Sequence, residues 1–456
     1  MEIIIIGDGK VGSSLAENLS RDNHEVTIID KNADVLKKAV ESLDVRCIVG
    51  NGVSSGVLIE AGVKEADLLI ACTSSDEMNM VCCLTGKKLG VKHTIARIRD
   101  TQYADELSQL KEDLGLDMVI NPERAVASEI ARLLQFPPAV KVETFVRGRV
   151  EMIEIRIAPS MEIVNMTLIN IARKFSQSIL IGAILRGEDV IIPNGDVTLH
   201  VDDLVYIVGR PAQVHEFCRK IGIHMNKIKA AMIIGGGRVA YYLAKYLSEI
   251  QIAATIIERD RQRCVALQES LPNALIIHGD GTEDGLLKSE NISQMQAFIS
   301  VTGHDEDNLM SGLLAKQYGV GKVVAKISRM MYSGVVKNIG IDNIVNPKLI
   351  TSNFITWFVR GMENAKGHKM DSLYKIVDGQ AEAVEFTVHA SHKRIVESQI
   401  KKIHLKPGII IAAVTHKDET FIPHGNDRIH AGDSVVLFAK NTRITDLNDI
   451  LEANGK

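Results

Sequence analysis

The sequence predicts an α/β protein in which two large parallel-sheet modules alternate with two small α+β modules. Three observations predict this class. A glycine-rich turn follows an apolar strand in each half, apolar runs alternate with helix-period segments, and a β-rich stretch follows each large module. We expect the large modules at 1–124 and 228–349, and the small modules at 140–224 and 369–453.

The second half of the sequence repeats the first at a nearly constant offset, which indicates an internal duplication. The hexapeptide GDGKVG at 7–12 returns as GGGRVA at 235–240, and Asp30 returns as Glu258 after a similar apolar run. The likeness extends into the small modules, where Asp203 corresponds to Asp433. Further pairs are GNG at 50–52 with GDG at 279–281, TSSDEMN at 73–79 with TGHDEDN at 302–308, and Asn121-Pro122 with Asn346-Pro347.

In the first large module, short apolar runs predict strands, and the segments between them have helical periodicity. This alternation requires a parallel sheet that is covered by helices on both faces. The predicted strands are Glu2–Ile6, Glu25–Asp30, Arg46–Val49, Asp67–Ala71, Thr94–Arg97 and Met118–Ile120.

The small module is predicted to be a compact α+β domain with one helix near Leu168–Phe175. Linkers between large and small modules are expected near Gln135–Val140 and Met362–Met370. The predicted strands of the first small module are Met152–Ile157, Ile179–Leu185, Asp189–Ile192 and Asp203–Gly209.

The first glycine-rich turn has the context of a dinucleotide-binding fingerprint, with a strand of four isoleucines before it and a helical pattern after it. Gly7 permits a tight turn, Gly9 allows the backbone to approach a pyrophosphate, and Gly12 lets the helix pack on the strand. The helix N-terminus offers free N–H groups and the positive end of its dipole to phosphate. The same glycines alone also occur in turns and helix caps, so the flanking strand and helix are what favour a Rossmann-like nucleotide site.

Asp30 ends the second predicted strand. A carboxylate at this position accepts hydrogen bonds from the ribose hydroxyls and repels a 2′-phosphate, which favours NAD over NADP. The alternative role is a cap for the segment that begins at Lys31. The glycine turn upstream favours the ribose role.

Thr73-Ser74 follows the fourth predicted strand and Arg97 ends the fifth, at the edge where doubly wound sheets bind ligands. Residues 74–77 also fit a helix capping box, and both roles can hold together. Arg97 is placed to pair with the pyrophosphate. The alternative for Arg97 is a surface salt bridge.

The second copy differs in its charges. Glu258 can still hold a ribose, and Ala240 is allowed in place of the third glycine. The added positive charge suits a nucleotide with more phosphate groups, or a weak site, so the ligand of the second copy is left open. The substitutions are Lys326 for Arg97, Gly303-His304 for Ser74-Ser75, and Lys348 for Glu123.

Composition and charge exclude several classes of function. The net charge of −4 gives no basic field for nucleic acid or an anionic membrane. No apolar stretch approaches the ~18 residues that span a bilayer, and the start of the sequence does not fit a signal peptide. None of the six cysteines forms a C-x-x-C pair, so they are expected to be free thiols in a reducing compartment.

No catalytic group and no metal site are predicted. His389 and His392 lie three residues apart without an evident carboxylate or cysteine partner. A dehydrogenase usually adds a substrate domain with a general acid or base beside the nicotinamide, whereas here the same pair of modules simply recurs. The pattern therefore favours nucleotide sensing, and an NAD-dependent oxidoreductase of unknown substrate is the alternative.

The order of modules and their motifs resemble the TrkA family, the peripheral regulators of Trk-type potassium transporters, and the wider family of RCK domains. The most specific signs are GNG at 50–52, TSSDEMN at 73–79 and ARIR at 96–99. The resemblance covers essentially the whole chain. It implies RCK N-terminal and C-terminal modules, bound NAD or NADH with ATP or ADP as further candidates, and a homo-oligomeric ring in the cytoplasm. Such a ring lies on the inner face of the cell membrane and gates a TrkH- or TrkG-like potassium pore subunit.

The resemblance also assigns cofactor-binding roles to the glycine turns, the acidic strand ends and the residues after the fourth and fifth strands. We add Gly12 of the first turn and three residues of the repeated motifs, Asn51, Asp280 and Thr302, to this set. The predicted cofactor-binding residues are Gly7, Asp8, Gly9, Lys10, Val11, Gly12, Asp30, Asn51, Thr73, Ser74 and Arg97 in the first copy, and Gly235, Gly236, Gly237, Arg238, Val239, Glu258, Asp280 and Thr302 in the second.

Overall fold

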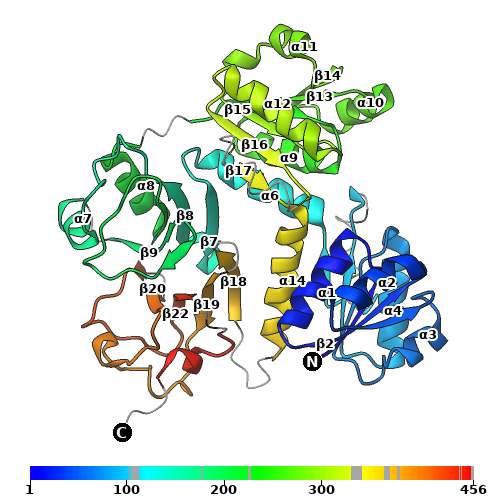
Figure 1. The fold of residues 1–456 in the computed structure, drawn as a ribbon, viewed down its shortest axis with the longest axis horizontal. Helices are drawn as coiled ribbons and strands as arrows, with labels where there is room; N and C mark the ends of the chain where they lie inside the picture. Colours follow the sequence, from blue (N-terminus) through cyan, green and yellow to red (C-terminus); the bar gives the residue numbers. More distant parts are fainter. Residues whose placement is uncertain are drawn as a thin grey trace. The chain divides into compact units, whose positions relative to one another are not determined.

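The predicted fold class is confirmed, because two parallel sheets and two antiparallel sheets follow one another in the predicted order (Figure 1). The chain divides into two compact units. Unit 1 contains residues 1–131 and 229–356 and holds both parallel sheets, and unit 2 contains residues 132–228 and 357–456 and holds both antiparallel sheets. The computed structural model describes all residues except 102, 104–110, 112, 176–177, 224–226, 330–340, 342, 364–369, 377–379, 418, 441, 443 and 453–456.

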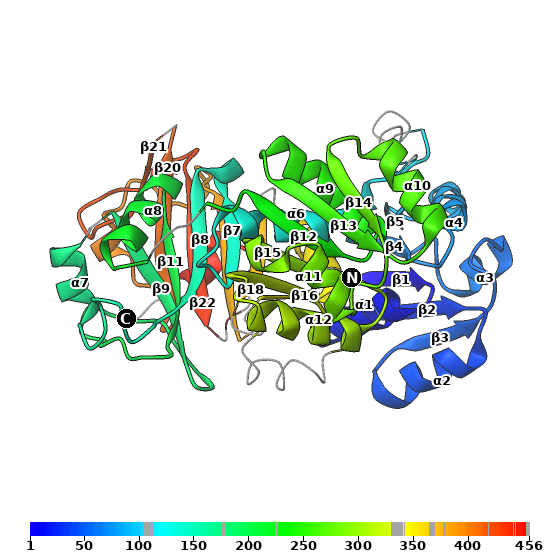
Figure 2. The same cartoon turned by 90° about the horizontal axis from the view of Figure 1, so that it is seen from above.

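The first parallel sheet has the strand order β3-β2-β1-β4-β5-β6, and Figure 2 shows β1, β2 and β3 side by side. Ile3 to Ile6 of β1 are at most 2 % exposed, because alternate side chains enter the cores on the two faces of the sheet. The strand order reverses between β1 and β4, so the C-terminal ends of these strands border the crevice where this fold binds ligands. The elements are β1 (Glu2–Ile6), α1 (Lys10–Arg21), β2 (Glu25–Asp30), α2 (Ala33–Ser42), β3 (Arg46–Val49), α3 (Ser55–Glu60), β4 (Leu68–Ala71), α4 (Asp76–Leu89), β5 (His93–Arg97), β6 (Met118–Ile120) and α6 (Pro122–Gln135).

The second parallel sheet repeats this topology as β14-β13-β12-β15-β16-β17. Its reversal lies between β12 and β15, which correspond to β1 and β4. The elements are β12 (Ala230–Ile234), α9 (Arg238–Glu249), β13 (Ala253–Glu258), α10 (Arg261–Ser270), β14 (Ala274–His278), α11 (Asp284–Ser289), η2 (Ile292–Gln294), β15 (Ala297–Ser300), α12 (Asp305–Gln317), β16 (Lys322–Lys326), β17 (Asn343–Val345) and α14 (Pro347–Glu363).

The two large modules pack reciprocally within unit 1. The last helix of each module lies beside the first helix of the other, with α14 against α1 and α6 against α9 (Figure 1). Asn18 of α1 donates a hydrogen bond to the Ser352 hydroxyl of α14. In the corresponding place, the Arg124 Nε of α6 donates to the Tyr246 hydroxyl of α9 at 3.1 Å. Each helix that follows a glycine turn is therefore connected to the other module.

The two small modules have antiparallel sheets of the same topology, β10-β9-β11-β8-β7 and β18-β19-β22-β20-β21. Their sheets share one core within unit 2, in which Phe145 and Met152 belong to the same cluster as Ala383 and Phe438. Gly182 allows this close packing, since an added Cβ would lie 2.7 Å from the Phe438 ring. The elements are β7 (Lys141–Phe145), η1 (Val146–Gly148), β8 (Val150–Arg156), α7 (Leu168–Lys174), β9 (Ile179–Arg186), β10 (Asp189–Ile191), β11 (Leu204–Gly209), α8 (Pro211–Lys220), β18 (Met370–Ile376), β19 (Ala381–Thr387), η5 (Ile400–Lys402), β20 (Ile409–His416), β21 (Glu419–Phe421), β22 (Ser434–Lys440) and η6 (Leu447–Ile450).

The structure adds a strand and a helix that the sequence patterns do not predict in the first small module. Strand β7 pairs only with β8 at the edge of its sheet, and α8 is a second helix of the module. The predicted linker at 135–140 begins at the last residue of α6 and ends before β7. The predicted linker at 362–370 overlaps the end of α14, and its residues 364–369 lie outside the described part of the chain.

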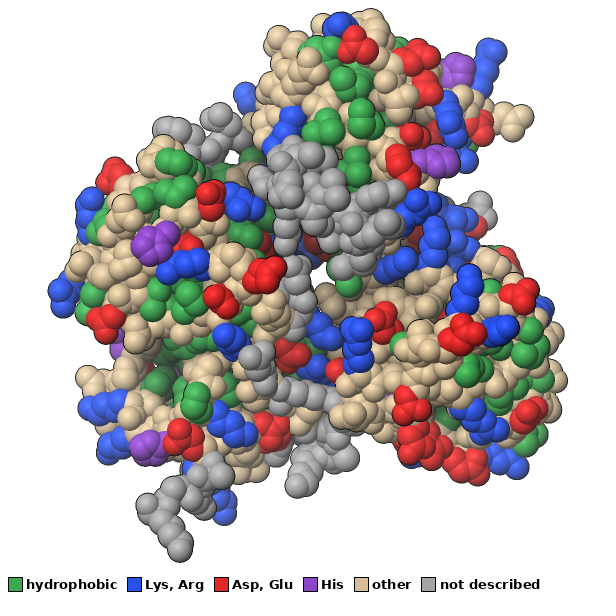
Figure 3. Space-filling view, in the orientation of Figure 1, with side chains coloured by type: hydrophobic (Ala, Val, Ile, Leu, Met, Phe, Trp, Pro, Cys, Tyr) green, Lys and Arg blue, Asp and Glu red, His purple; other side chains and the backbone are tan. Residues whose placement is uncertain are grey.

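The surface of the described residues is polar and mixed in charge. Lys and Arg side chains are interspersed with Asp and Glu side chains over both units on the face in Figure 3. Of the helices that the structure describes, none combines the length and the apolarity needed to cross a lipid bilayer. Five of the six cysteines are buried, all six are free, and burial raises the pKa of the Cys72 thiol to about 12.

We predict that Gly12→Ala destabilises the protein by about 1–3 kcal/mol, because α1 must move away from the turn to accommodate the methyl group. A Cβ at Gly12 would lie only 1.9 Å from the Gly7 carbonyl oxygen. The second module has the buried Ala240 at this position, so Ala240→Gly is the matched control and is expected to cost roughly 0.5–1 kcal/mol. Urea unfolding measures both changes, and an equal or smaller loss for Gly12→Ala would contradict the close packing of α1.

Candidate nucleotide-binding sites

The first glycine turn connects β1 to α1 in a conformation that favours glycine. Gly7 has φ +96°, and a Cβ there would lie 3.0 Å from the backbone of Thr73. Gly9 is the N-cap of α1, has no side-chain cap, and would direct a Cβ into open space. Lys10 is exposed and Val11 is buried in the first turn of α1. The turn therefore presents backbone N–H groups that a ligand can approach closely.

Asp30 ties the glycine turn to the end of β2. Its Oδ2 accepts a hydrogen bond from the Asp8 N–H at 2.7 Å, and its Oδ1 accepts one from the Asn32 N–H at 2.9 Å. Asn32, whose side chain accepts from the Asp34 N–H, is the N-cap of α2. The alternative role of Asp30 as a helix cap is therefore wrong. Each carboxylate oxygen has a further lone pair for a ligand hydroxyl.

Asp8 is a buried carboxyl group inside the turn. It is 5 % exposed, and its Oδ1 has no hydrogen-bond partner among the described residues. Burial, followed by the charge of Asp30, raises the pKa of Asp8 to about 6. At neutral pH the turn thus holds two adjacent negative charges.

Asn79 connects the ends of β4 and β5, although the sequence analysis does not place it in the site. Its Oδ1 accepts hydrogen bonds from both the N–H and the hydroxyl of Thr73, each at 2.8 Å. Its Nδ2 donates to the Arg97 carbonyl at 2.7 Å, and the Asn79 side chain is fully buried. The recurrence of an asparagine six residues after the threonine in both copies is the sequence signal that could have found it.

Arg97 places a partly buried positive charge beside this strand end. Its Nη2 donates to the Thr73 carbonyl at 2.7 Å, while its buried Nε has no hydrogen-bond partner among the described residues. Burial, with the charge of Arg99, lowers the pKa of Arg97 below its ordinary value, although a guanidinium still keeps its proton. Within the described part of the chain Arg97 forms no ion pair with a carboxylate, so the surface salt bridge is not observed.

The start of α4 differs from the predicted capping box. Ser75 is the N-cap, and its hydroxyl accepts a hydrogen bond from the Met78 N–H at 3.1 Å. Ser74 precedes the cap and is exposed, and its carbonyl accepts a hydrogen bond from Arg99. A capping box at 74–77 is wrong because the helix begins one residue later than that pattern requires.

The loop at 50–52 lies against the end of β1. An added Cβ at Gly52 would be 2.3 Å from Ile6, so only glycine fits this approach. Asn51 is exposed, and its side chain accepts a hydrogen bond from the Val53 N–H at 3.3 Å within its own turn. The loop therefore brings Asn51 to the same sheet edge as the glycine turn.

The second module repeats the backbone arrangement. Gly235 has φ +94° and a Cβ there would lie 3.1 Å from Thr302, while Gly237 caps α9 and faces open space. Asn308 accepts hydrogen bonds from the N–H and hydroxyl of Thr302 at 2.8 Å and donates to the Lys326 carbonyl at 2.8 Å. The same scaffold therefore supports both sites.

The charges of the second site are different. The Gly236 N–H donates to Glu258 at 2.7 Å, and Arg263 lies 3.5 Å from the same carboxylate oxygen. Burial lowers the pKa of Lys326, which stands in the place of Arg97. No carboxylate corresponds to Asp8, because Gly236 occupies that position. Of the remaining predicted residues, Val239 is buried, Arg238 is exposed at the start of α9, and Asp280 accepts hydrogen bonds from the N–H and hydroxyl of Thr282.

Family models match both types of module. The TrkA-N domain matches residues 3–122 and 231–347, and the TrkA-C domain matches residues 152–222 and 383–452. The structure of a GsuK channel bound to NAD is similar in fold, with a TM-score of 0.63 at 18 % identity, covering 96 % of this chain and 77 % of that one.

Full-length relatives are found in archaea and bacteria. The chain is 35 % identical to the Trk system potassium uptake protein TrkA homolog 2 of Methanosarcina mazei, over 99 % of this chain and 100 % of that protein. It is 33 % identical to the Trk system potassium uptake protein TrkA of Vibrio alginolyticus, over 97 % of this chain and 96 % of that protein. The chain, with its two copies of each domain, belongs to the TrkA family of Trk potassium uptake systems.

Proposed function

We propose that this chain is a regulatory subunit that binds a nicotinamide dinucleotide and thereby gates a TrkH- or TrkG-like potassium pore in the membrane. The observation that carries this proposal is the set of groups at the carboxyl edge of the first sheet. A free helix N-terminus, a ribose-type carboxylate and a partly buried cation that pairs with no carboxylate among the described residues adjoin the same strand ends. The first two groups are those that bind the pyrophosphate and ribose of a dinucleotide in this fold, the cation adds charge for the phosphates, and membership of the TrkA family supports the link to potassium uptake.

Each group of the first site has a specific role in the proposal. The N–H groups at the start of α1 bind the pyrophosphate, and Asp30 accepts hydrogen bonds from the adenosine ribose. Arg97 supplies the charge that the phosphates require, because its guanidinium is desolvated and directed at no acidic side chain. Thr73, held by Asn79, lies beside the turn and fixes the position of the strand end.

The ligand preference follows from the charges. NAD or NADH fits the first site, because Asp30 repels the 2′-phosphate of NADP. In the second site Arg263 partly neutralises Glu258. Lys326 takes the place of Arg97 there, and burial lowers its pKa. ATP and ADP are the further candidates for that site.

Coupling to the pore proceeds through the packing of unit 1. Ligand binding draws the glycine turn, Asp30 and Arg97 together and moves α1, which contacts α14 of the other module. In a homo-oligomeric ring on the inner face of the membrane, such a movement changes the angle between neighbouring modules. A differential affinity of about 1–3 kcal/mol between two ring conformations suffices for useful coupling.

Reconstitution tests this function directly. Vesicles that contain a TrkH-like pore subunit are expected to change their rubidium uptake on addition of NAD or NADH only when this chain is present, with the nucleotide recovered unchanged. ATP and ADP serve as parallel ligands. Failure of the chain to associate with the pore, or hydride transfer to alcohol or hydroxy-acid substrates, would contradict the proposal, and the second result would favour an oxidoreductase.

We predict that Asp30→Ala weakens NAD binding by about tenfold or more, since a charge-assisted hydrogen bond contributes about 1.5–3 kcal/mol. The variant should also discriminate less against NADP. Asp34→Ala is the matched control, because Asp34 is an exposed carboxylate in the first turn of α2. Calorimetry and thermal unfolding measure affinity and folding, and unchanged affinity of a folded Asp30→Ala chain would disprove the ribose role.

We predict that NAD binds more tightly as the pH falls from about 8 through 6, because protonation of Asp8 removes a negative charge beside the pyrophosphate site. The pKa of Asp8 rises from its ordinary value of 3.8 to about 6 on folding. Its contribution to stability is therefore full below 3.8 and is lost as the pH rises through 6. Asp8→Asn should remove this part of the pH dependence of both affinity and stability. Identical pH profiles for the variant and the unmodified chain would contradict the assignment.

A further inference from the structure

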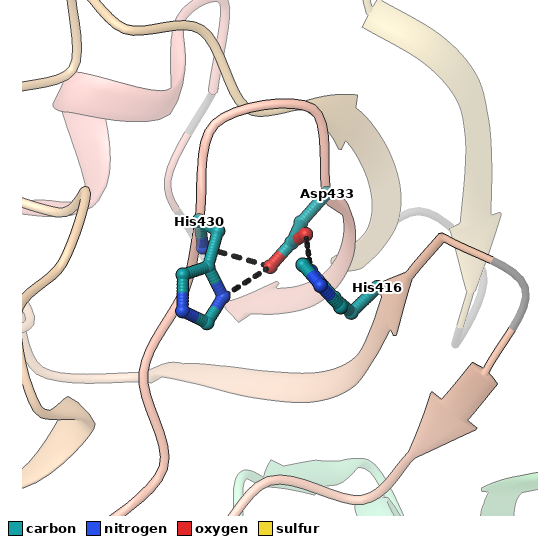
Figure 4. Close-up of side chains that lie close together, drawn as sticks. All are labelled: His416, His430 and Asp433. Carbon is teal, nitrogen blue, oxygen red and sulfur yellow. Dashed lines mark hydrogen bonds and ion pairs between the residues drawn. The ribbon is translucent and has the colours of Figure 1, made fainter.

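The second small module contains a buried carboxylate between two imidazole rings (Figure 4). Asp433 precedes β22 and its side chain is 1 % exposed. The His416 Nδ1, at the end of β20, lies 2.6 Å from the Asp433 Oδ1. The backbone N–H of His430 donates to the Asp433 Oδ2 at 2.8 Å, and the ring Nδ1 of His430 lies 3.6 Å from that same oxygen.

The duplicated module shows what this carboxylate lacks. In the first small module, Arg186 donates two hydrogen bonds to the corresponding Asp203, from Nε at 2.9 Å and from Nη2 at 2.8 Å. His416 stands in the place of Arg186, so one contact of 2.6 Å from an imidazole replaces the two hydrogen bonds from a guanidinium that always carries its charge. A buried carboxylate requires a cationic partner or an equivalent set of hydrogen bonds. Asp433 therefore lacks the fixed positive charge that Arg186 gives to Asp203, and a bound metal ion would supply it.

The donor atoms of His416, His430 and Asp433 lie close enough together to contact one metal ion. One atom from each of the three residues lies within 4.8 Å of the other two. The His430 Nδ1 is buried and has no hydrogen-bond partner among the described residues, although it faces the carboxylate. Bonds of about 2.0–2.1 Å in a tetrahedral site place neighbouring ligand atoms roughly 3.4 Å apart. The His416 Nδ1 lies 2.6 Å from Oδ1 and the His430 Nδ1 lies 3.6 Å from Oδ2 of the Asp433 carboxylate, so a bound ion would replace the His416 contact.

We propose that His416, His430 and Asp433 bind a divalent transition-metal ion of the zinc type. Two imidazole nitrogens and one carboxylate oxygen suit Zn²⁺, Co²⁺ or Ni²⁺ rather than Mg²⁺ or Ca²⁺, which prefer sites made of oxygen ligands. Both histidine side chains are about two-fifths exposed, so water can complete the coordination and the ion can exchange with solvent.

A neighbouring carboxylate supports this assignment. The Glu397 carboxylate lies 3.8 Å from the His430 Nε2, on the side of the ring opposite the ligand nitrogen. A carboxylate in that position orients a ligating imidazole and fixes its tautomer. Ligand atoms bind a metal ion only when they are deprotonated, so affinity should fall as the pH decreases.

Titration of the full chain with Zn²⁺ tests the site, with His416→Arg as the decisive variant. Arginine at this position reproduces the Arg186–Asp203 pair of the first module, so the variant is expected to fold while losing a metal ligand. We expect His416→Arg to bind one Zn²⁺ ion per chain fewer than the unmodified protein, or to bind that ion at least about tenfold more weakly. Excess Zn²⁺ should raise the thermal midpoint of the unmodified chain more than that of the variant.

Two further variants make the outcome unambiguous. His430→Gln removes a second ligand and should cause the same loss. His424→Gln is the matched control, because His424 lies on the same segment and its side chain is 64 % exposed outside the cluster. Co²⁺ absorption spectra provide an independent readout of tetrahedral nitrogen and oxygen ligands. Unchanged stoichiometry and affinity in either ligand variant, or an equal loss in His424→Gln, would overturn the proposal.

Discussion

The close approach of two parallel strand ends is the constraint on which both proposed nucleotide sites depend. After β1 the backbone must pass directly over Thr73, which follows β4, and Gly7 meets this requirement with a positive φ and no side chain. Gly235 and Thr302 repeat the arrangement in the second module with almost the same spacing. This turn directs the N-terminus of the next helix toward the crevice at the point where the strand order reverses. The hydrogen bonds from the turn to Asp30 and Glu258 then fix the acidic residue of each site.

Duplication has preserved the backbone of each module and changed its charges. The buried asparagine that joins the ends of two strands is the same in both copies, with matching partners and distances. The first turn holds Asp8 beside Asp30, whereas the second has Gly236 beside Glu258, and Glu258 is paired with Arg263. The small modules show the same divergence, since a permanent Arg186–Asp203 ion pair becomes a histidine–aspartate pair at Asp433. The two halves of the chain therefore share one backbone arrangement but differ in the charges at corresponding positions.

The sequence predicted the parallel sheets closely because each strand is a short apolar run and each fills a core on both faces. All six predicted strands of the first sheet begin within one residue of their observed starts, and four of them, such as Glu2–Ile6, match at both ends. Strand β7 was harder to predict, because an edge strand pairs on one side only and its residues Lys141–Phe145 mix charged and apolar side chains. Helix α8 lacks a side-chain N-cap and a long apolar stripe, so its local pattern is weak.

Candidate site residues could be predicted from the sequence where their spacing along the chain forms a motif. Residues whose role depends on contacts between distant segments could not. Gly7, Gly9 and Asp30 could be placed because their spacing reflects one βαβ unit. The partly buried state of Arg97 without an acidic partner depends on tertiary packing and has no local signal. The cluster around Asp433 was missed for the same reason, since its histidines come from a strand end and a loop. Comparison of the two copies at Asp203 and Asp433 was the available clue.

The central claim is that a dinucleotide binds, unreacted, at the carboxyl edge of the duplicated sheets. A crystal structure of the full chain grown with NADH tests it most directly. The account predicts the pyrophosphate at the N-terminus of α1 beside Gly9, the adenosine ribose on Asp30, and the Arg97 guanidinium on the phosphates. Empty glycine turns in both modules at saturating NADH, or nucleotide bound elsewhere, would contradict the account.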